Sequence, residues 1–298
     1  MIHDPRSRKA IVVIQPISSI SNLVPIEREF EMSNKNFTII SEVIYRYAGI
    51  VLQDIKQDMV YSRVSRRIRK TGCLGFDDYL VIALNQKNTE FTHFINAITT
   101  NFTSFFREPY HFDFIKNIAI PEWKSNASRN KLRIWSAGSS SGEEAYSIAM
   151  TLSGRIPSQW DTKILATDLD TNVVAQGQSG VYAVDRVSAL SKELVVQHFN
   201  KVTVDAKMCV QLKKSIRNMA SFKPLNLLHY WPMSGQFEMI FCRNVVIYFD
   251  KPTQKKLFDR FADILVPGGY LVIGHSESMF KLSNRFASVG HTVYRKIK

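Results

Sequence analysis

The stretch Ile134-Trp135-Ser136-Ala137-Gly138-Ser139-Ser140-Ser141-Gly142-Glu143-Glu144 contains the pattern on which the fold prediction depends. An apolar run, Leu132 to Ser136, leads into a loop of small residues, and a helical pattern follows from Glu143 to Leu152. This order of strand, loop and helix lets a cofactor approach the backbone closely. The stretch is neither the dinucleotide GxGxxG nor a P-loop, so by itself it fits a plain strand-to-helix turn equally well.

The same alternation of short apolar runs and helical patterns continues on the C-terminal side. An amphipathic helix is predicted from Thr253 to Leu265, before Pro267-Gly268-Gly269. Alternation of this kind is typical of a parallel α/β sheet, so residues 98–298 are predicted to form a doubly wound sheet domain. The predicted strands are Leu132 to Ser136, Lys163 to Thr167, Phe237 to Phe241 and Tyr270 to Gly274.

Asp168 follows the second predicted strand directly. Nucleoside-binding α/β folds use an acid at this place to accept hydrogen bonds from ribose hydroxyls. The alternative is that Asp168 only caps a helix that begins near Asp170. The strand–loop–helix pattern and this carboxylate together favour a nucleoside-containing cofactor.

The N-terminal part of the chain has a different pattern. Residues 1–32 lack sustained periodicity and are expected to be a loosely ordered extension. From Asn36 to Thr71 apolar residues recur at helical spacing, and a further helix is predicted from Phe76 to Leu84. Residues 33–97 are therefore expected to form a small all-helical domain.

Residues from 180 to about 222 interrupt the α/β alternation. A helix is predicted from Ser191 to Phe199. Short strands are predicted after it, at Lys201 to Val204, Met208 to Leu212 and Ser215 to Met219. The segment is expected to be an inserted, small antiparallel β subdomain.

One predicted helix in the N-terminal domain carries a basic face. Its apolar stripe is formed by Val60, Val64 and Ile68. A docking surface for an acidic partner and a merely solvated charged face explain the pattern equally well. The basic residues, at i, i+3, i+4 and i+7, are Arg63, Arg66, Arg67 and Lys70.

Composition limits the function classes without selecting one. The chain has 298 residues, 45% of them apolar, and a formal net charge of +13, which suits nucleic acid, an anionic membrane surface or a carboxylate-rich protein. No apolar run approaches the roughly 18 residues of a membrane span. The cysteines, Cys73, Cys209 and Cys242, are scattered, so neither a metal site nor a disulfide framework is expected. No export signal is evident, and a cytoplasmic location is expected.

Several separated blocks resemble the chemotaxis receptor methyltransferase (CheR) family. The first runs from Asn101 to Pro109 and continues with His111 and Phe112, and the second is Trp135 to Glu144. The resemblance covers roughly residues 36–296 and includes the basic helix. The remaining blocks, in order, are Phe222-Lys223-Pro224-Leu225-Asn226-Leu227-Leu228, Phe241-Cys242-Arg243-Asn244-Val245-Val246-Ile247-Tyr248-Phe249 and Gly274-His275-Ser276-Glu277.

The resemblance implies a class I methyltransferase fold that binds S-adenosylmethionine and releases S-adenosylhomocysteine, with no metal. Arg107 and Tyr248 are implied to face the methyl-transfer centre. As single residues, Asn226 and Asn244 also fit turns, and Tyr248 also fits a core position. The residues implied to bind the cofactor are Asn101, Thr103, Arg107, Glu143, Asp168, Asn226, Leu227, Arg243 and Asn244.

The implied reaction is the methylation of glutamate side chains on the cytoplasmic domain of methyl-accepting chemotaxis receptors. A glutamate side chain exposed to water has a pKa of about 4.3, so it is ionised at neutral pH and needs no general base. Acidic receptor helices would suit the basic face. In some members of the family the insert binds a C-terminal receptor peptide by strand addition, and its turn is rich in glycine. Residues 201–207 contain no glycine here, so binding of receptors without this peptide contact is the open alternative.

Two other functions fit parts of the same sequence. A nucleic-acid methyltransferase typically has Asn/Asp-Pro-Pro-Tyr/Phe near its fourth strand. This chain has Arg243-Asn244-Val245-Val246 there, which argues against nucleic acid as the partner. A cofactor-binding signalling scaffold without activity is the alternative from another class. The sequence does not fix the oligomeric state, and a monomer is compatible with it.

Overall fold

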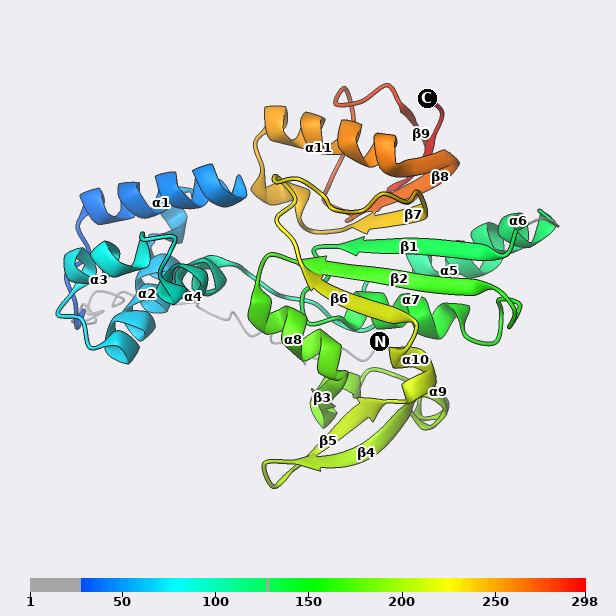
Figure 1. The fold of residues 1–298 in the computed structure, drawn as a ribbon, viewed down its shortest axis with the longest axis horizontal. Helices are drawn as coiled ribbons and strands as arrows, with labels where there is room; N and C mark the ends of the chain where they lie inside the picture. Colours follow the sequence, from blue (N-terminus) through cyan, green and yellow to red (C-terminus); the bar gives the residue numbers. More distant parts are fainter. Residues whose placement is uncertain (1–27, 127–128) are drawn as a thin grey trace, which may run out of the picture.

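The computed structural model describes residues 28–126 and 129–298, and its chain path is drawn in Figure 1. The first 27 residues of the expected extension lie outside the described residues. No helix in the described ranges is both long and apolar enough to cross a membrane.

The N-terminal unit is all-helical, as the apolar spacing predicts. Ser33 and Asn36 form a reciprocal capping box at the start of α1, and Gly49 ends the helix in the left-handed conformation with φ of 70°. The unit has a hydrophobic core of its own, centred on side chains such as Ile40, Val64 and Phe94. Its elements are α1 (Asn34–Ala48), η1 (Asp54–Lys56), α2 (Gln57–Thr71), α3 (Phe76–Ala83) and α4 (Thr89–Ile98).

The main sheet confirms the doubly wound α/β prediction. It has seven strands in the order β6-β2-β1-β7-β8-β10-β9, and β6, β2, β1, β7 and β8 run parallel. Each strand predicted for this sheet is present. The strands are β1 (Lys131–Ala137), β2 (Asp161–Asp168), β6 (Ala220–Pro224), β7 (Phe237–Cys242), β8 (Leu265–Ile273), β9 (Phe286–Gly290) and β10 (Val293–Lys296).

Successive strand residues point to opposite faces, and each face packs against its own helices. Ile134, which pairs with Ile164, belongs to the cluster that includes α7. Trp135, which pairs with Ile240, belongs to the cluster that includes α11. The sheet is therefore covered on both faces, as Figure 1 shows. The helical elements of this domain are α5 (Tyr110–Phe114), η2 (Ile115–Ala119), α6 (Ile120–Ser125), α7 (Glu143–Leu152), α8 (Thr171–Ser179), η4 (Val246–Tyr248) and α11 (Lys251–Ile264).

The insert is a separate three-stranded antiparallel sheet in the order β3-β5-β4. The prediction of a strand at Ser215 to Met219 is wrong, because helix α10 (Lys214–Arg217) lies there. Ala220 then begins β6 of the main sheet, so the insert ends just before it and not at 222. Its other elements are β3 (Val181–Ala183), η3 (Val184–Val187), α9 (Lys192–His198), β4 (Phe199–Val204) and β5 (Lys207–Leu212).

The helical unit is fastened to the carboxyl end of the sheet. Asn96 of α4 donates to Thr171 Oγ1 at 2.9 Å, at the start of α8. The Val51 amide donates to the Tyr248 carbonyl at 2.8 Å. Thr99 to Thr103 and Arg107, which follow α4, line the pocket at this edge. The two units therefore meet where the strands end, which is where open α/β sheets bind ligands.

Candidate active site

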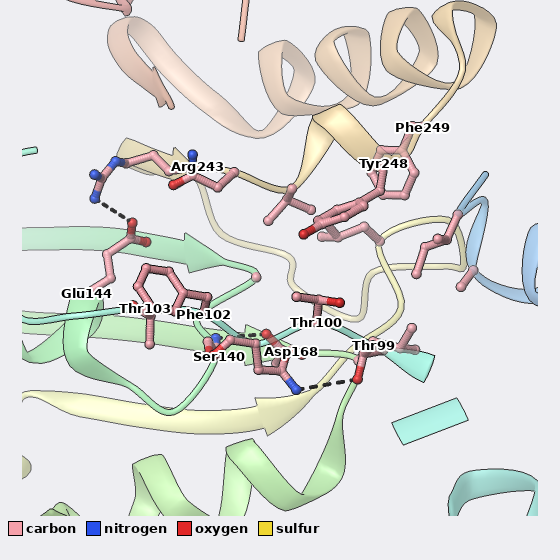
Figure 2. A pocket seen from close by; sticks show the side chains of 18 of the residues that line it. Thr99, Thr100, Phe102, Thr103, Ser140, Glu144, Asp168, Arg243, Tyr248 and Phe249 are labelled. Carbon is pink, nitrogen blue, oxygen red and sulfur yellow. Dashed lines mark hydrogen bonds and ion pairs between the residues drawn. The ribbon is translucent and has the colours of Figure 1, made fainter. Parts of the chain in front are cut away.

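A pocket with about 910 Å³ of empty space, partly open to solvent, lies at the carboxyl ends of the central strands. Figure 2 shows Tyr248 pointing into it from one side and Asp168 lying on the opposite side. Its walls come from both domains. The lining residues are Ala48, Ile50, Thr99, Thr100, Asn101, Phe102, Thr103, Arg107, Gly138, Ser140, Glu144, Asp168, Leu169, Leu225, Asn226, Leu227, Arg243, Asn244, Val245, Tyr248 and Phe249.

The small-residue loop after β1 forms the pocket wall nearest to Asp168. Gly138 has a φ of 86°, and a Cβ there would come within 2.3 Å of Val245 Cγ2, so only glycine fits. Ser140 also has a positive φ, of 47°, and its amide donates to Asp168 Oδ2 at 2.8 Å. The loop is therefore held against the carboxylate by its own backbone, which leaves room for a ligand above it.

Asp168 ends β2 with its carboxyl group buried in the pocket wall. Its Oδ1 accepts a hydrogen bond from the Asp170 amide at 3.0 Å. Burial raises the pKa of Asp168 to about 6, although the hydrogen bonds from Asp170 and Ser140 oppose the shift. The cap of α8 is Asp170, which accepts from Asn172 at 2.9 Å, so the interpretation of Asp168 as the helix cap is wrong.

Asn101 and Thr103 follow α4 and line the pocket, as expected. The side-chain NH₂ group of Asn101 donates to Asp170 Oδ2 at 2.6 Å. The backbone carbonyl of Asn101 accepts from the Ser140 hydroxyl at 3.1 Å. The Thr103 carbonyl accepts from Arg186 of the insert at 2.9 Å. These bonds join the loop after α4 to the loop after β1, to the start of α8 and to the insert, so this wall is held together by segments far apart in the chain.

Arg243 is the buried cation of the site. Its Nη1 lies 3.0 Å from Glu144 Oε2, its Nη2 lies 3.2 Å from Glu108 Oε2, and its side chain is 3% exposed. Nη2 also donates to the Arg107 carbonyl, whereas Nε has no partner among the described residues. Burial would raise the pKa of Glu108, but the His275 hydrogen bond and Arg243 together lower it to about 2. Both carboxylates thus hold the guanidinium against the pocket.

The structure separates the two consecutive glutamates at the start of α7. Glu144 lines the pocket and accepts from Ser136 Oγ at 2.7 Å. Glu143, which the resemblance implies as a cofactor residue, is fully buried outside the lining residues and pairs with Arg186 and Ser141. The sequence pattern did not single out Glu144. Adjacent helix residues point about 100° apart, so only one of the pair could face the pocket, but no local signal indicated which.

Asn226, Leu227 and Asn244 also line the pocket, with their polar groups largely engaged. The Asn226 side chain donates to the Tyr47 carbonyl at 2.6 Å and accepts from the Leu228 amide at 2.9 Å. Asn244 has a φ of 59°, in the left-handed region that non-glycine residues adopt infrequently. These residues shape the wall through turn geometry, and each still presents a surface to the pocket.

Tyr248 and Arg107 both line the pocket. Burial raises the pKa of Tyr248, and the positive charges of Arg107 and Arg63 oppose this without reversing it, so the hydroxyl stays protonated at neutral pH. Arg107 donates to the Phe102 carbonyl at 2.9 Å and stacks near the Phe102 ring, at 5.5 Å to its centroid. A protonated phenol and a guanidinium therefore line the same pocket.

Comparison with known proteins gives the family. Residues 35–99 match the all-alpha domain of the CheR methyltransferases, and residues 101–295 match their SAM-binding domain. This chain belongs to the CheR methyltransferase family. It is 40% identical over 284 residues to the chemotaxis protein methyltransferase of Escherichia coli (strain K12), covering 94% of this chain and 96% of that protein. It is 39% identical to chemotaxis protein methyltransferase 2 of Pseudomonas aeruginosa, covering 90% and 95% respectively.

Membership of the CheR family identifies S-adenosylmethionine as the cofactor, and the pocket residues suit it. The Asp168 carboxylate lies in the pocket wall, at the place where nucleoside-binding α/β folds use an acid to accept hydrogen bonds from ribose hydroxyls. Arg107, Arg243 and Glu144 supply charges of both signs, which a zwitterionic methionine group requires. The close approach of the Gly138 backbone supplies the space. Within residues 28–126 and 129–298, no cluster of His, Cys, Asp and Glu could hold a metal ion.

The basic face of this CheR protein is smaller than the sequence indicates. Arg63 donates to the Ala97, Ile98 and Thr99 carbonyls, at 3.2, 2.9 and 2.6 Å, and so caps the end of α4. Arg67 forms a two-pronged pair with Glu90, at 2.9 and 2.6 Å. Arg66 and Lys70 remain exposed. Helical spacing correctly placed all four cations on α2, but the partners on α4 engage two of them.

Proposed function

We propose that this CheR methyltransferase transfers methyl groups to glutamate side chains on acidic helices of methyl-accepting chemotaxis receptors, giving glutamyl methyl esters and S-adenosylhomocysteine for sensory adaptation. The carrying observation is that Tyr248 and Arg107 line one pocket with Thr99, whose carbonyl accepts a hydrogen bond from Arg63 of α2 at 2.6 Å. The reaction centre and the basic helix therefore adjoin. The names of the relatives from E. coli and P. aeruginosa support a chemotaxis role, and a cytoplasmic location follows from such a substrate.

The chemistry needs alignment more than proton transfer. A glutamate carboxylate is ionised at neutral pH, and its oxygen attacks the methyl carbon that the bound cofactor supplies, while the departing sulfur keeps the bonding electron pair. We assign Tyr248 as a hydrogen-bond donor that orients the carboxylate, since its raised pKa keeps the proton on the phenol. Arg107 orients the same carboxylate by charge. Both roles position the nucleophile without removing a proton.

The cofactor contacts are proposed residue by residue from the pocket walls. Asp168 receives the ribose hydroxyls, and Arg107, Arg243 and Glu144 contact the methionine group. Glu143 is kept in the proposal only as a support for the pocket, through its pair with Arg186, which also holds the Thr103 carbonyl. The other proposed contacts are Asn101, Thr103, Asn226, Leu227 and Asn244, all of which line the pocket.

Receptor docking is assigned to the exposed part of α2. Arg66 and Lys70 present positive charge to solvent, and Arg63 adds a partly buried charge that donates to the carbonyl of the pocket residue Thr99. An acidic helix would thus be attracted and aligned by charge, with its glutamates beside Tyr248. Such steering weakens as salt shortens the range of the field.

The proposal is tested with isotopically labelled S-adenosylmethionine and a receptor cytoplasmic fragment. Label that enters the receptor and is released by mild base identifies a carboxyl methyl ester, because N-methyl groups resist that treatment. Replacing the methylatable glutamates of the fragment with glutamine or alanine should prevent incorporation. Label in an added nucleic acid but none in the receptor would contradict the proposal.

A further inference from the structure

The segment Gly274-His275-Ser276-Glu277, which resembles a family block, has no role in the pocket described above, because none of its residues lines the cavity. It directly follows β8. Ile273 at the end of β8 pairs with Cys242 at the end of β7, so the segment emerges beside Arg243 and Asn244. The segment therefore lies next to the loop that carries Tyr248, outside the lining of the pocket.

Glu277 binds that loop through the backbone alone. Its Oε2 accepts from the Gly274 and Asn244 amides at 2.6 and 3.0 Å, and its Oε1 accepts from the Ile247 amide at 3.3 Å. The residue is 5% exposed, and in the described part of the chain its hydrogen-bond partners are backbone N–H groups. A buried carboxylate costs more than an apolar side chain of the same size, so its presence needs an explanation beyond filling space.

Gly274 makes this contact sterically possible. A Cβ at this position would lie 2.6 Å from Asn244 Nδ2 and 3.0 Å from both the Asn244 amide nitrogen and Glu277 Oε2. Any side chain would therefore push the 243–248 loop away from the carboxylate. The contact also supports Asn244 in its left-handed conformation, at a φ of 59°.

His275 reaches the opposite side of the site. Its Nδ1 lies 2.8 Å from Glu108 Oε1, and the other oxygen of Glu108 lies 3.2 Å from Arg243 Nη2. Glu108 itself has a φ of 58°. The segment thus contacts both loops that supply the arginines of the pocket, the one after α4 with Arg107 and the one after β7 with Arg243.

We propose that Gly274–Glu277 is a positioning clamp for methyl transfer, in which Glu277 holds the loop carrying Asn244 and Tyr248, and His275 holds Glu108 and, through it, Arg243. The reaction named here is that of the proposed function, on which this inference rests. The residues of the clamp act through others, since the cavity walls do not include them. Loss of the Glu277 contacts should therefore misalign the reacting groups with little change in cofactor affinity, whereas loss of the His275 contact should weaken cofactor binding through Arg243.

The first test compares Glu277→Gln with wild type. The amide keeps one acceptor but turns an NH₂ group toward either the Gly274 and Asn244 amides or the Ile247 amide. We expect the single-turnover methylation rate to fall about tenfold or more, while the dissociation constant for S-adenosylhomocysteine changes less than about threefold. The rate is measured per binding-competent site, counted by titration with S-adenosylhomocysteine. Glu193→Gln, the same change at a glutamate exposed on α9, is the matched control.

A merely structural role gives a different result. It would lower the melting temperature and the number of binding-competent sites but leave the rate per site at the wild-type value, which would overturn the clamp. If Glu277→Gln does not fold, Glu277→Asp, which keeps the charge but shortens the reach, replaces it with the same expectation. Combining Glu277→Gln with Tyr248→Phe should slow transfer less than the product of the two single effects, because both act on the same hydroxyl. Full multiplicativity would contradict the assignment to Tyr248.

The second arm needs no receptor and so separates this inference from the proposed function. His275→Ala and Glu108→Gln should each weaken S-adenosylhomocysteine binding about threefold or more, and the double variant should be no weaker than the worse single variant. Independent, multiplicative losses, or no loss, would overturn the link from His275 to Arg243. Wild-type protein that binds the cofactor but labels no receptor would refute the proposed function, and this arm would still decide whether the link exists.

Discussion

Helix α2 and the loop after β7 both carry arginines that the sequence singles out, but these arginines have different surroundings. In α2, Arg63 and Arg67 direct their donors to α4, whereas the other two residues of the basic face, Arg66 and Lys70, remain exposed. In the loop, Arg243 is also paired, with two carboxylates, but its side chain lies in the wall of the pocket. Sequence spacing gives the direction of a side chain. Its partners, which come from distant residues, determine whether it stabilises the fold or faces a ligand.

The largest expected effect comes from removing the buried cation, with Arg243→Ala. Glu108 and Glu144 would then be left without their shared partner, and removal of one partner of a buried ion pair typically costs about 3–5 kcal/mol. We expect a loss of stability of this order and loss of cofactor binding, measured by denaturant unfolding and calorimetry. Arg66→Ala is the matched control. A stability change below about 1 kcal/mol for Arg243→Ala would contradict the buried network.

A smaller loss of stability is expected within α2. Arg67→Ala leaves Glu90, which is 9% exposed in its side chain, facing only the Tyr79 hydroxyl, and a charged hydrogen bond of this kind contributes about 1.5–3 kcal/mol. Arg66→Ala should change the free energy of unfolding by less than about 0.5 kcal/mol. Denaturant unfolding of both variants is the measurement. Equal effects would remove the distinction between structural and docking cations on α2.

The exposed cations of α2, Arg66 and Lys70, are expected to affect the rate of receptor methylation and not the stability of the protein. Changing Arg66 and Lys70 together to Glu should lower receptor methylation at subsaturating receptor about tenfold, because attraction to an acidic helix becomes repulsion. The wild-type rate should fall as salt is added, and the variant should lose that dependence. Cofactor affinity, measured separately, should stay at the wild-type value. A double variant with a normal rate at low salt would show that α2 does not dock the substrate.

The sequence predicted those parts of the site that depend on local pattern. The strand, loop and helix around Gly138, and the carboxylate at the end of β2, follow from spacing and residue type alone. The structure corrected features that depend on distant partners. The segment from Ser215 to Met219, predicted as a strand, begins with helix α10, and Ile216 of this helix is buried in the core of the main domain. The choice between Glu143 and Glu144 likewise required Arg186 and Arg243, which lie far along the chain.

Protonation of Asp168 is expected to change protein stability and cofactor affinity in opposite directions. Burial raises its pKa from 3.8 to about 6 in the ligand-free protein. Since the folded pKa is above the unfolded value, protonation of Asp168 favours folding, and this contribution is lost as the pH rises through about 6. Cofactor binding has the opposite sign, because the ionised carboxylate is the better acceptor for ribose hydroxyls. Affinity for S-adenosylhomocysteine should therefore weaken below about pH 6, approaching tenfold per pH unit at the limit.

Calorimetry between pH 7.5 and 5 measures this dependence, and Asp168→Asn supplies the control. The asparagine variant should bind more weakly at pH 7.5, because it cannot carry the charge, and its affinity should change little down to pH 5. Every other ionisable group is the same in both proteins, so the difference between the two curves isolates Asp168. If both proteins lose affinity in parallel as the pH falls, the carboxylate does not receive the ribose hydroxyls, and the acid at the end of β2 only holds the Ser140 loop.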